Sequence, residues 1–162
     1  MNEHQAKMLR QMAVFGGLKN ESLELILGES HRLVLAAGDY FFHEGDPGES
    51  LYVIEAGTVL IQRMWKHESI MLGRLASGDC FGEMSLIDFQ SRSAAAQAEC
   101  NCETIEIPRT VLQSLYRMNV EQYAMIMMNL GREVSRRLRI ADDCLFQLQQ
   151  DHGVETPFAG TV

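Results

Sequence analysis

The distribution of apolar and polar residues divides the chain into three regions, of which the first is helical. Leu18, Leu23, Ile26 and Leu27 are spaced like one buried face of an α-helix. We therefore expect residues 1–30 to form a helical lead-in to the rest of the chain.

The second region, residues 31–107, consists of short apolar runs that glycine, aspartate and proline interrupt. The runs are RLVLAAGDYFF, EGDPGESLYVIEAGTVLIQ, SIMLGRLASGDCFG and SAAAQAECNCETIEI. Runs of this length with turn residues between them predict short antiparallel strands in a sandwich or barrel. In the segment LYVI four apolar residues follow one another, so we expect both faces of this strand to be covered.

Helical spacing returns in residues 108–150, where the second of two predicted helices carries a nearly heptad repeat. Its apolar positions are Leu130, Val134, Leu138, Ala141, Leu145 and Leu148. Such a repeat favours a two-helix contact between two copies of the chain. The alternative is that this face packs back on the strands of its own chain. Residues 151–162 show no period and are predicted to be a tail.

Length and charge limit the classes of function. The chain of 162 residues, 46% of them hydrophobic, suits one packed domain with an appendage. With 22 acidic and 14 basic side chains, the formal net charge is -8, which argues against binding of nucleic acid or anionic lipid by the whole surface. No apolar run approaches the length of a membrane span, so we expect a cytoplasmic protein without membrane contact. Any anion must be bound locally.

Metal chemistry has little support in the sequence. The four cysteines show no C-x-x-C spacing, and they are predicted to be free thiols. A cupin-type metal enzyme would need clustered histidines with a carboxylate, whereas His31, His43 and His67 are scattered. No nucleophile with a base and an orienting partner can be assembled either, so we expect no enzyme and no metal.

The segment CFGEMSLIDFQSRSAAA, residues 80–96, has the chemistry of a local anion site. A helical turn after Gly82 presents unpaired N–H groups, and Arg92 offers two N–H groups to phosphate oxygens. The carboxylate of Glu83 accepts hydrogen bonds and repels phosphate, so it suits a neighbouring hydroxyl. A phosphate with a sugar hydroxyl beside it describes a nucleotide. The alternative is a plain Glu83–Arg92 ion pair at a bend.

Two motifs resemble the cyclic-nucleotide-binding domain family. FGEMSLIDFQSRSAA is similar to its phosphate-binding cassette, F-G-E-L-A-L followed by a short loop and R-A-A or R-S-A, and places the cassette at residues 81–95. AAGDYFFHEGDPGESLYVIEAGTV resembles the two hairpins that precede the cassette. The resemblance implies an α+β fold, an antiparallel β-roll of the jelly-roll or double-stranded β-helix kind, flanked by N-terminal and C-terminal helices.

The resemblance also implies roles for individual residues. Arg92 would bind the cyclic phosphate and Glu83 the ribose 2′-hydroxyl, and the Ser93 hydroxyl would touch the phosphate. Ala95 stands where relatives that prefer cGMP often have a hydroxyl, which favours cAMP over cGMP as the ligand. The remaining expected ligand contacts are the cassette residues Gly82, Met84, Ser85 and Ala94, with Ala141 and Asp142 as possible base contacts. An exposed aspartate on the helix surface is the alternative for Asp142.

These expectations combine into a stand-alone cAMP receptor that needs no other cofactor. The long helix would form a homodimer and report ligand occupancy to a separate protein effector. No helix-turn-helix follows this helix, so direct DNA binding is not expected. The arginines beside the heptad repeat are expected to lie on a solvated face (Arg132, Arg136, Arg137 and Arg139). Two alternatives stay open: a scaffold domain that binds no nucleotide, and the sensor fragment of a larger regulator.

Overall fold

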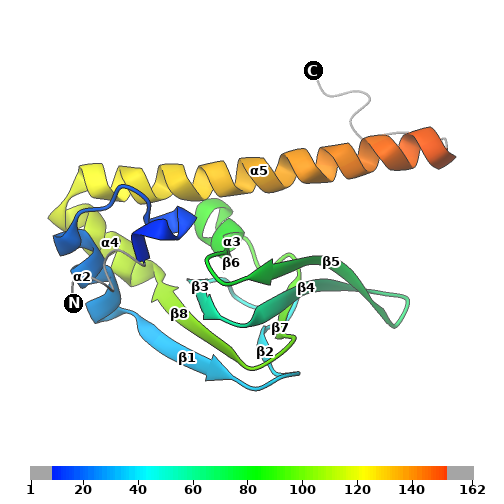
Figure 1. Cartoon of the computed structure of the whole chain (residues 1–162), viewed down its shortest axis with the longest axis horizontal. Helices are drawn as coiled ribbons and strands as arrows, with labels where there is room; N and C mark the ends of the chain where they lie inside the picture. The colour runs from blue at the N-terminus through cyan, green and yellow to red at the C-terminus, as the bar shows by residue number, and fades with distance from the viewer. Residues whose placement is uncertain (1–8, 153–162) are drawn as a thin grey trace.

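Eight strands form two antiparallel sheets in the computed structural model, which describes residues 9–152 (Figure 1). The first sheet has the order β1-β8-β3-β6 and the second the order β2-β7-β4-β5. The strands are β1 His31–Leu35, β2 Tyr40–Phe42, β3 Ser50–Ala56, β4 Thr58–Trp65, β5 Glu68–Ala76, β6 Cys80–Phe81, β7 Ala95–Ala98 and β8 Cys102–Pro108. The α+β class and the helix-flanked β-roll are confirmed.

Strand β3 separates two apolar cores, which explains its unbroken apolar run. Leu51 and Val53 belong to the core that the first sheet shares with the helices. Tyr52 and Ile54 point the other way, into the core between the two sheets. Because successive side chains of a strand point to opposite faces, a strand covered on both faces must be apolar at every position.

η1, α2 and α4 gather at one end of the roll, where α5 begins before it runs along the roll (Figure 1). The helical elements are the 3-10 turn η1 Ala13–Phe15, α2 Asn20–Glu29, α4 Arg109–Met118 and α5 Val120–His152, while the short α3 Glu83–Asp88 follows β6. Buried leucines and isoleucines from these helices pack against β3 and β8 and hold the helical end on the sheet (Leu23, Ile26, Leu112, Leu115, Ile126 and Leu130).

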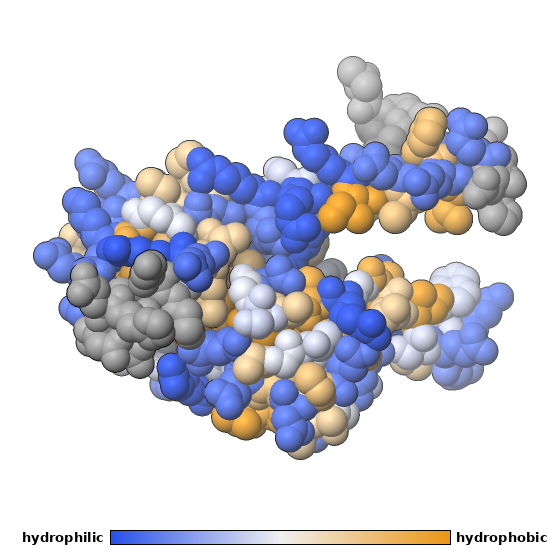
Figure 2. All heavy atoms as spheres, viewed as in Figure 1, coloured by the Kyte–Doolittle hydropathy of each residue, from blue (hydrophilic) through white to orange (hydrophobic). Residues whose placement is uncertain are grey.

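The first part of α5 contributes to this core. Leu130 is fully buried, whereas Leu138, Leu145 and Leu148 are exposed. The prediction that Leu130 shares a partner surface with these leucines is wrong, because its side chain packs inside its own chain. Figure 2 shows the later part of α5 projecting from the body, with apolar side chains on the side that faces the β4–β5 hairpin. Within residues 9–152, no helix is both long and apolar enough to cross a membrane.

Candidate functional site

The segment between β6 and β7 forms a tight turn, a short helix and a loop, and together they build the candidate site. Gly82 sits between β6 and α3 with φ 80°, a left-handed conformation that glycine adopts without strain. A Cβ on Gly82 would lie 2.6 Å from Nη1 of Arg92 and 3.1 Å from the carbonyl oxygen of Ser50. Glycine is therefore required here for close approach as well as for backbone conformation.

Arg92 lies inside this turn and is only 5% exposed. Its Nη1 donates to the carbonyl oxygen of Gly82 and its Nη2 to that of Ser50, both at 2.7 Å. Its Nε is buried and has no hydrogen-bond partner. Burial is the main reason that the pKa of Arg92 is lowered from its ordinary value. A buried cation with an unpaired donor is suited to an anionic ligand, because an unmatched buried donor costs free energy.

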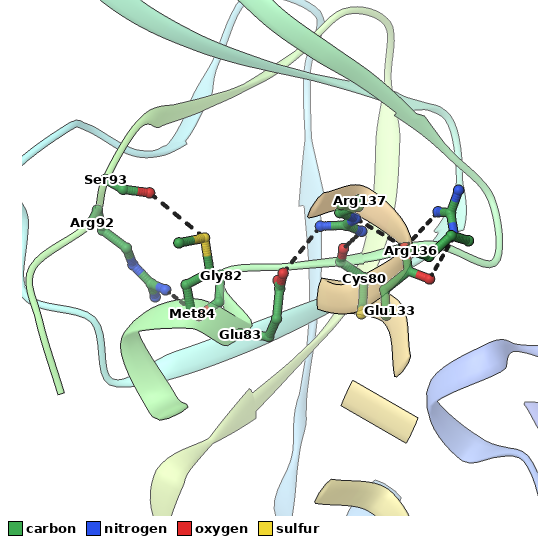
Figure 3. Close-up of polar contacts among 9 residues, drawn as sticks. All are labelled: Cys80, Gly82, Glu83, Met84, Arg92, Ser93, Glu133, Arg136 and Arg137. Carbon is green, nitrogen blue, oxygen red and sulfur yellow. Dashed lines mark hydrogen bonds and ion pairs between the residues drawn. The ribbon is translucent and has the colours of Figure 1, made fainter. Parts of the chain in front are cut away.

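Glu83, the first residue of α3, is buried and ion-paired with Arg137 of α5 (Figure 3). Oε1 of Glu83 lies 3.1 Å from Nη1 of Arg137, whose Nε donates to Glu133 at 2.9 Å and whose Nη2 donates to the carbonyl oxygen of Cys80. Burial raises the pKa of Glu83 above its ordinary value, and the positive charge of Arg137 opposes this rise. The carboxylate thus joins the cassette to α5.

A second arginine joins the cassette to α4. Nη2 of Arg109, the first residue of α4, donates to the carbonyl oxygens of Gly48 and Ser85 at 3.2 Å each. Its guanidinium also lies 4.5 Å from the ring centroid of Phe89, the residue that follows α3. Any movement of α3 must therefore change contacts at the start of α4.

The structure brings most of the predicted site residues to one place. Gly82, Glu83 and Met84 lie at the start of α3, and Arg92 and Ser93 face them from the loop before β7 (Figure 3). The Ser93 hydroxyl is 4.0 Å from Sδ of Met84. Ser85 and Ala94 are buried at the same site, while Ala141 and Asp142 are exposed on α5, one turn beyond the arginine that holds Glu83.

Two interpretations of the charged residues need correction. Glu83 pairs with Arg137 and not with Arg92, so the simple Glu83–Arg92 bend is absent. Arg137 was predicted to lie on a solvated face, but it is the α5 partner of the cassette. The sequence held one signal for it: Arg137 lies four residues after Glu133 and its side chain leans toward the same helix face. Nothing in the sequence pattern connects it with Glu83, 54 residues earlier.

Comparison with known proteins identifies the family of this fold. The family model described as "Cyclic nucleotide-binding domain" matches residues 32–119, more than half of the chain. The chain belongs to the cyclic nucleotide-binding domain family. The resemblance inferred from the two motifs is thereby confirmed.

Bacterial cAMP regulators are among the relatives of this cyclic nucleotide-binding domain. The Cyclic AMP receptor protein of Thermus thermophilus is 34% identical over 130 residues, which cover 80% of this chain and 58% of the relative. The cAMP-activated global transcriptional regulator Vfr of Pseudomonas aeruginosa is 34% identical over 127 residues, 75% of this chain and 57% of the relative.

A solved structure agrees with these relatives. The crystal structure of the Thermus thermophilus Catabolite Activator Protein matches with a TM-score of 0.72 and 33% identity. The match covers 85% of this chain and 63% of that chain. The chain spans less than two thirds of the length of each of these three proteins.

Proposed function

We propose that this cyclic nucleotide-binding domain is a cAMP receptor that works by binding and not by catalysis. The observation that carries the proposal is the buried Arg92, whose two terminal nitrogens donate to the carbonyl oxygens of Gly82 and Ser50 and whose Nε has no hydrogen-bond partner. The names of the two bacterial relatives, a cyclic AMP receptor and a cAMP-activated regulator, support cAMP as the nucleotide.

The two charged groups divide the recognition of the nucleotide between them. Arg92 supplies the positive charge and the donors that a phosphate diester requires. Glu83 can only accept hydrogen bonds while it is ionised, so it selects the ribose hydroxyl and not the phosphate. Arg137 compensates the negative charge of Glu83 inside the protein, with its Nη1 3.1 Å from Oε1 of Glu83. The site therefore suits a ligand that presents an anion and a hydroxyl side by side.

Occupancy of the site is transmitted, in this proposal, through the two arginine contacts of the cassette. One contact runs from Glu83 to Arg137 on α5, and the other from the Ser85 carbonyl to Arg109 on α4. A shift of α3 on nucleotide binding changes both contacts and so moves the helices relative to the β-roll. A protein effector in trans would recognise the new position of α5. The cytoplasmic location of the protein stays a prediction.

The exposed part of α5 supports a homodimer. Leu138, Leu145 and Leu148 are 59%, 42% and 51% exposed, and they continue the heptad spacing beyond the part of α5 that packs on its own chain. Apolar residues at this spacing are buried when two helices pair along their length. A second copy of the chain is therefore the proposed partner of this surface.

Calorimetric titration with cAMP, and separately with cGMP, tests the proposed function. We expect wild-type protein to bind cAMP more tightly than cGMP, and Arg92→Ala to weaken cAMP binding at least a hundredfold. Arg63→Ala is the matched control, because Arg63 is an exposed arginine whose ion pair is with Glu44. If folded wild-type protein binds neither nucleotide, the domain is a scaffold and the proposal fails. Equal cAMP affinity of Arg92→Ala and wild type would remove Arg92 from the site.

A further inference from the structure

Four aromatic side chains line the inside of the β-roll beside the cassette. They come from β2, β3 and β6, and are Phe41, Phe42, Tyr52 and Phe81. Tyr52 and Phe81 are stacked with ring centroids 5.1 Å apart and an interplanar angle of 15°, and both phenylalanines of β2 contact this pair. The Tyr52 hydroxyl donates to Glu106 at 3.1 Å, which fixes the tyrosine ring.

One of these rings lies against the guanidinium of Arg92. The central carbon of the guanidinium is 4.1 Å from the ring centroid of Phe42, and 5.9 Å from that of Tyr52. A cation at this distance from the face of an aromatic ring is attracted by the electron-rich face. Phe41, the neighbour of Phe42 in β2, packs on Tyr52 and Phe81, and no cation–π contact of Phe41 is found in the described part of the chain.

The ring and the carbonyl groups constrain Arg92 in different directions. Two carbonyl oxygens, of Gly82 and Ser50, accept hydrogen bonds from its two terminal nitrogens in the plane of the guanidinium. The centre of the guanidinium lies over the ring of Phe42, with its central carbon 4.1 Å from the ring centroid. The ring contact and the two hydrogen bonds together restrict the movement of the guanidinium more than the hydrogen bonds alone would.

We propose that Phe42 is a positioning residue for the cyclic nucleotide, because its ring fixes the orientation of the Arg92 guanidinium. The inference rests on the proposed function, in which Arg92 binds the phosphate. Ordering a long side chain during binding lowers affinity, and a side chain ordered beforehand avoids that cost. Burying the charge of Arg92 costs free energy, as the lowered pKa of this arginine indicates. The electron-rich ring of Phe42 offsets part of this cost.

The test compares leucine substitutions at two adjacent phenylalanines. Immobilising one such side chain costs about 0.5–1.5 kcal/mol, which corresponds to about two- to tenfold in affinity. We therefore expect Phe42→Leu to weaken cAMP binding by about two- to tenfold in calorimetric titration. Phe41→Leu removes a ring from the same aromatic group without touching Arg92, and we expect its cAMP affinity to stay within about twofold of wild type.

A second substitution separates the electrostatic role of the ring from its volume. Replacement of Phe42 by a trifluorinated phenylalanine keeps the shape of the ring nearly unchanged but withdraws electron density from its face. We expect this protein to fold, to unfold at a slightly lower temperature than wild type because the contact with Arg92 is weakened in the free protein as well, and to bind cAMP more weakly. This variant also tests the inference if Phe42→Leu does not fold.

The outcomes distinguish this inference from the proposed function. Loss of cAMP affinity in both Phe42 proteins, with Phe41→Leu close to wild type, supports the positioning role. Equal losses in Phe41→Leu and Phe42→Leu, or unchanged affinity in the fluorinated protein, overturn it and leave the receptor function standing. Failure of the wild-type protein to bind cAMP overturns both.

Discussion

Replacement of Arg137 by glutamine tests whether the link between the cassette and α5 holds the domain together. Arg137 is the α5 residue that pairs with Glu83, and it also donates to Glu133 and to the Cys80 carbonyl. Arg136, the adjacent residue, forms an ion pair with Glu133. In the described part of the chain no other ion pair of Arg136 is found. Comparison of Arg137→Gln with Arg136→Gln therefore distinguishes the effect of losing the link to the cassette from the effect of losing an ion pair within the helix.

The expected magnitudes follow from burial. Breaking a buried ion pair by removing one partner costs about 3–5 kcal/mol, because the remaining charge has no compensation. Glu83 is buried, but the Arg137 side chain is 27% exposed, so water screens part of the interaction and we expect a loss of about 2–3 kcal/mol. Arg136 is 54% exposed and its pair lies within one helix turn, so its loss should stay below about 1 kcal/mol.

Urea unfolding at one fixed protein concentration measures both values. The fixed concentration matters because self-association makes the stability depend on concentration. With a slope of about 2 kcal/mol per M, a difference of about 2 kcal/mol between the two variants separates their midpoints by about 1 M. Equal midpoints would refute the reasoning, since they would mean that Glu83 gains nothing from Arg137 beyond an exposed pair.

Three further predictions concern the turn, the carboxylate and the exposed helix. Gly82→Ala should lose at least tenfold in cAMP affinity by titration. Gly78 also has a positive φ, 94°, but nothing lies within 4 Å of a new Cβ there, so Gly78→Ala should lose only stability. Equal cAMP affinities of the two variants would show that the close approach of Arg92 to Gly82 does not matter for binding. Because burial raises the pKa of Glu83 above 4.5, its ionised form disfavours the folded state. The free energy of unfolding of wild type should therefore fall relative to Glu83→Gln as the pH rises above 4.5, and parallel pH profiles in urea unfolding would contradict this. Leu138→Asp should shift light-scattering mass from dimer to monomer and Ile140→Asp, on the other side of α5, should not; a monomeric wild type would end the dimer proposal.

The β-roll was accessible to sequence reasoning because its signals are local. Strand length, turn residues and the unbroken apolar run of β3 all act over a few residues, and the two cores around β3 explain that run. Helix ends are harder to place from the sequence: asparagine favours the N-cap position, but Asn20 is the first residue of α2, and its side chain accepts a hydrogen bond from Arg10. A short polar side chain signals the neighbourhood of a helix end, but tertiary partners decide where it bonds.

The partners of the charged groups were not accessible, because they depend on contacts between distant segments. The cassette motif indicates Glu83 and Arg92, but the pairing of Glu83 with Arg137 joins residues 54 positions apart. The same holds for Phe42, whose ring reaches Arg92 because β2 pairs with β7, the strand that follows Arg92. A hydrophobic residue in a strand looks the same in the sequence whether it fills a core or supports a cation.

Burial of one cation resolves how a chain with a net charge of -8 can bind an anion. At physiological ionic strength exposed charges are screened over about 8 Å, so the acidic surface contributes little inside the cassette. Arg92 is buried, and its interaction with a contacting phosphate is weakened far less by water. Glu83 does not cancel this charge, because Arg137 compensates it from the side of α5. The affinity for nucleotide should consequently depend strongly on these few buried groups and weakly on salt, in contrast to proteins that attract nucleic acid with a basic surface.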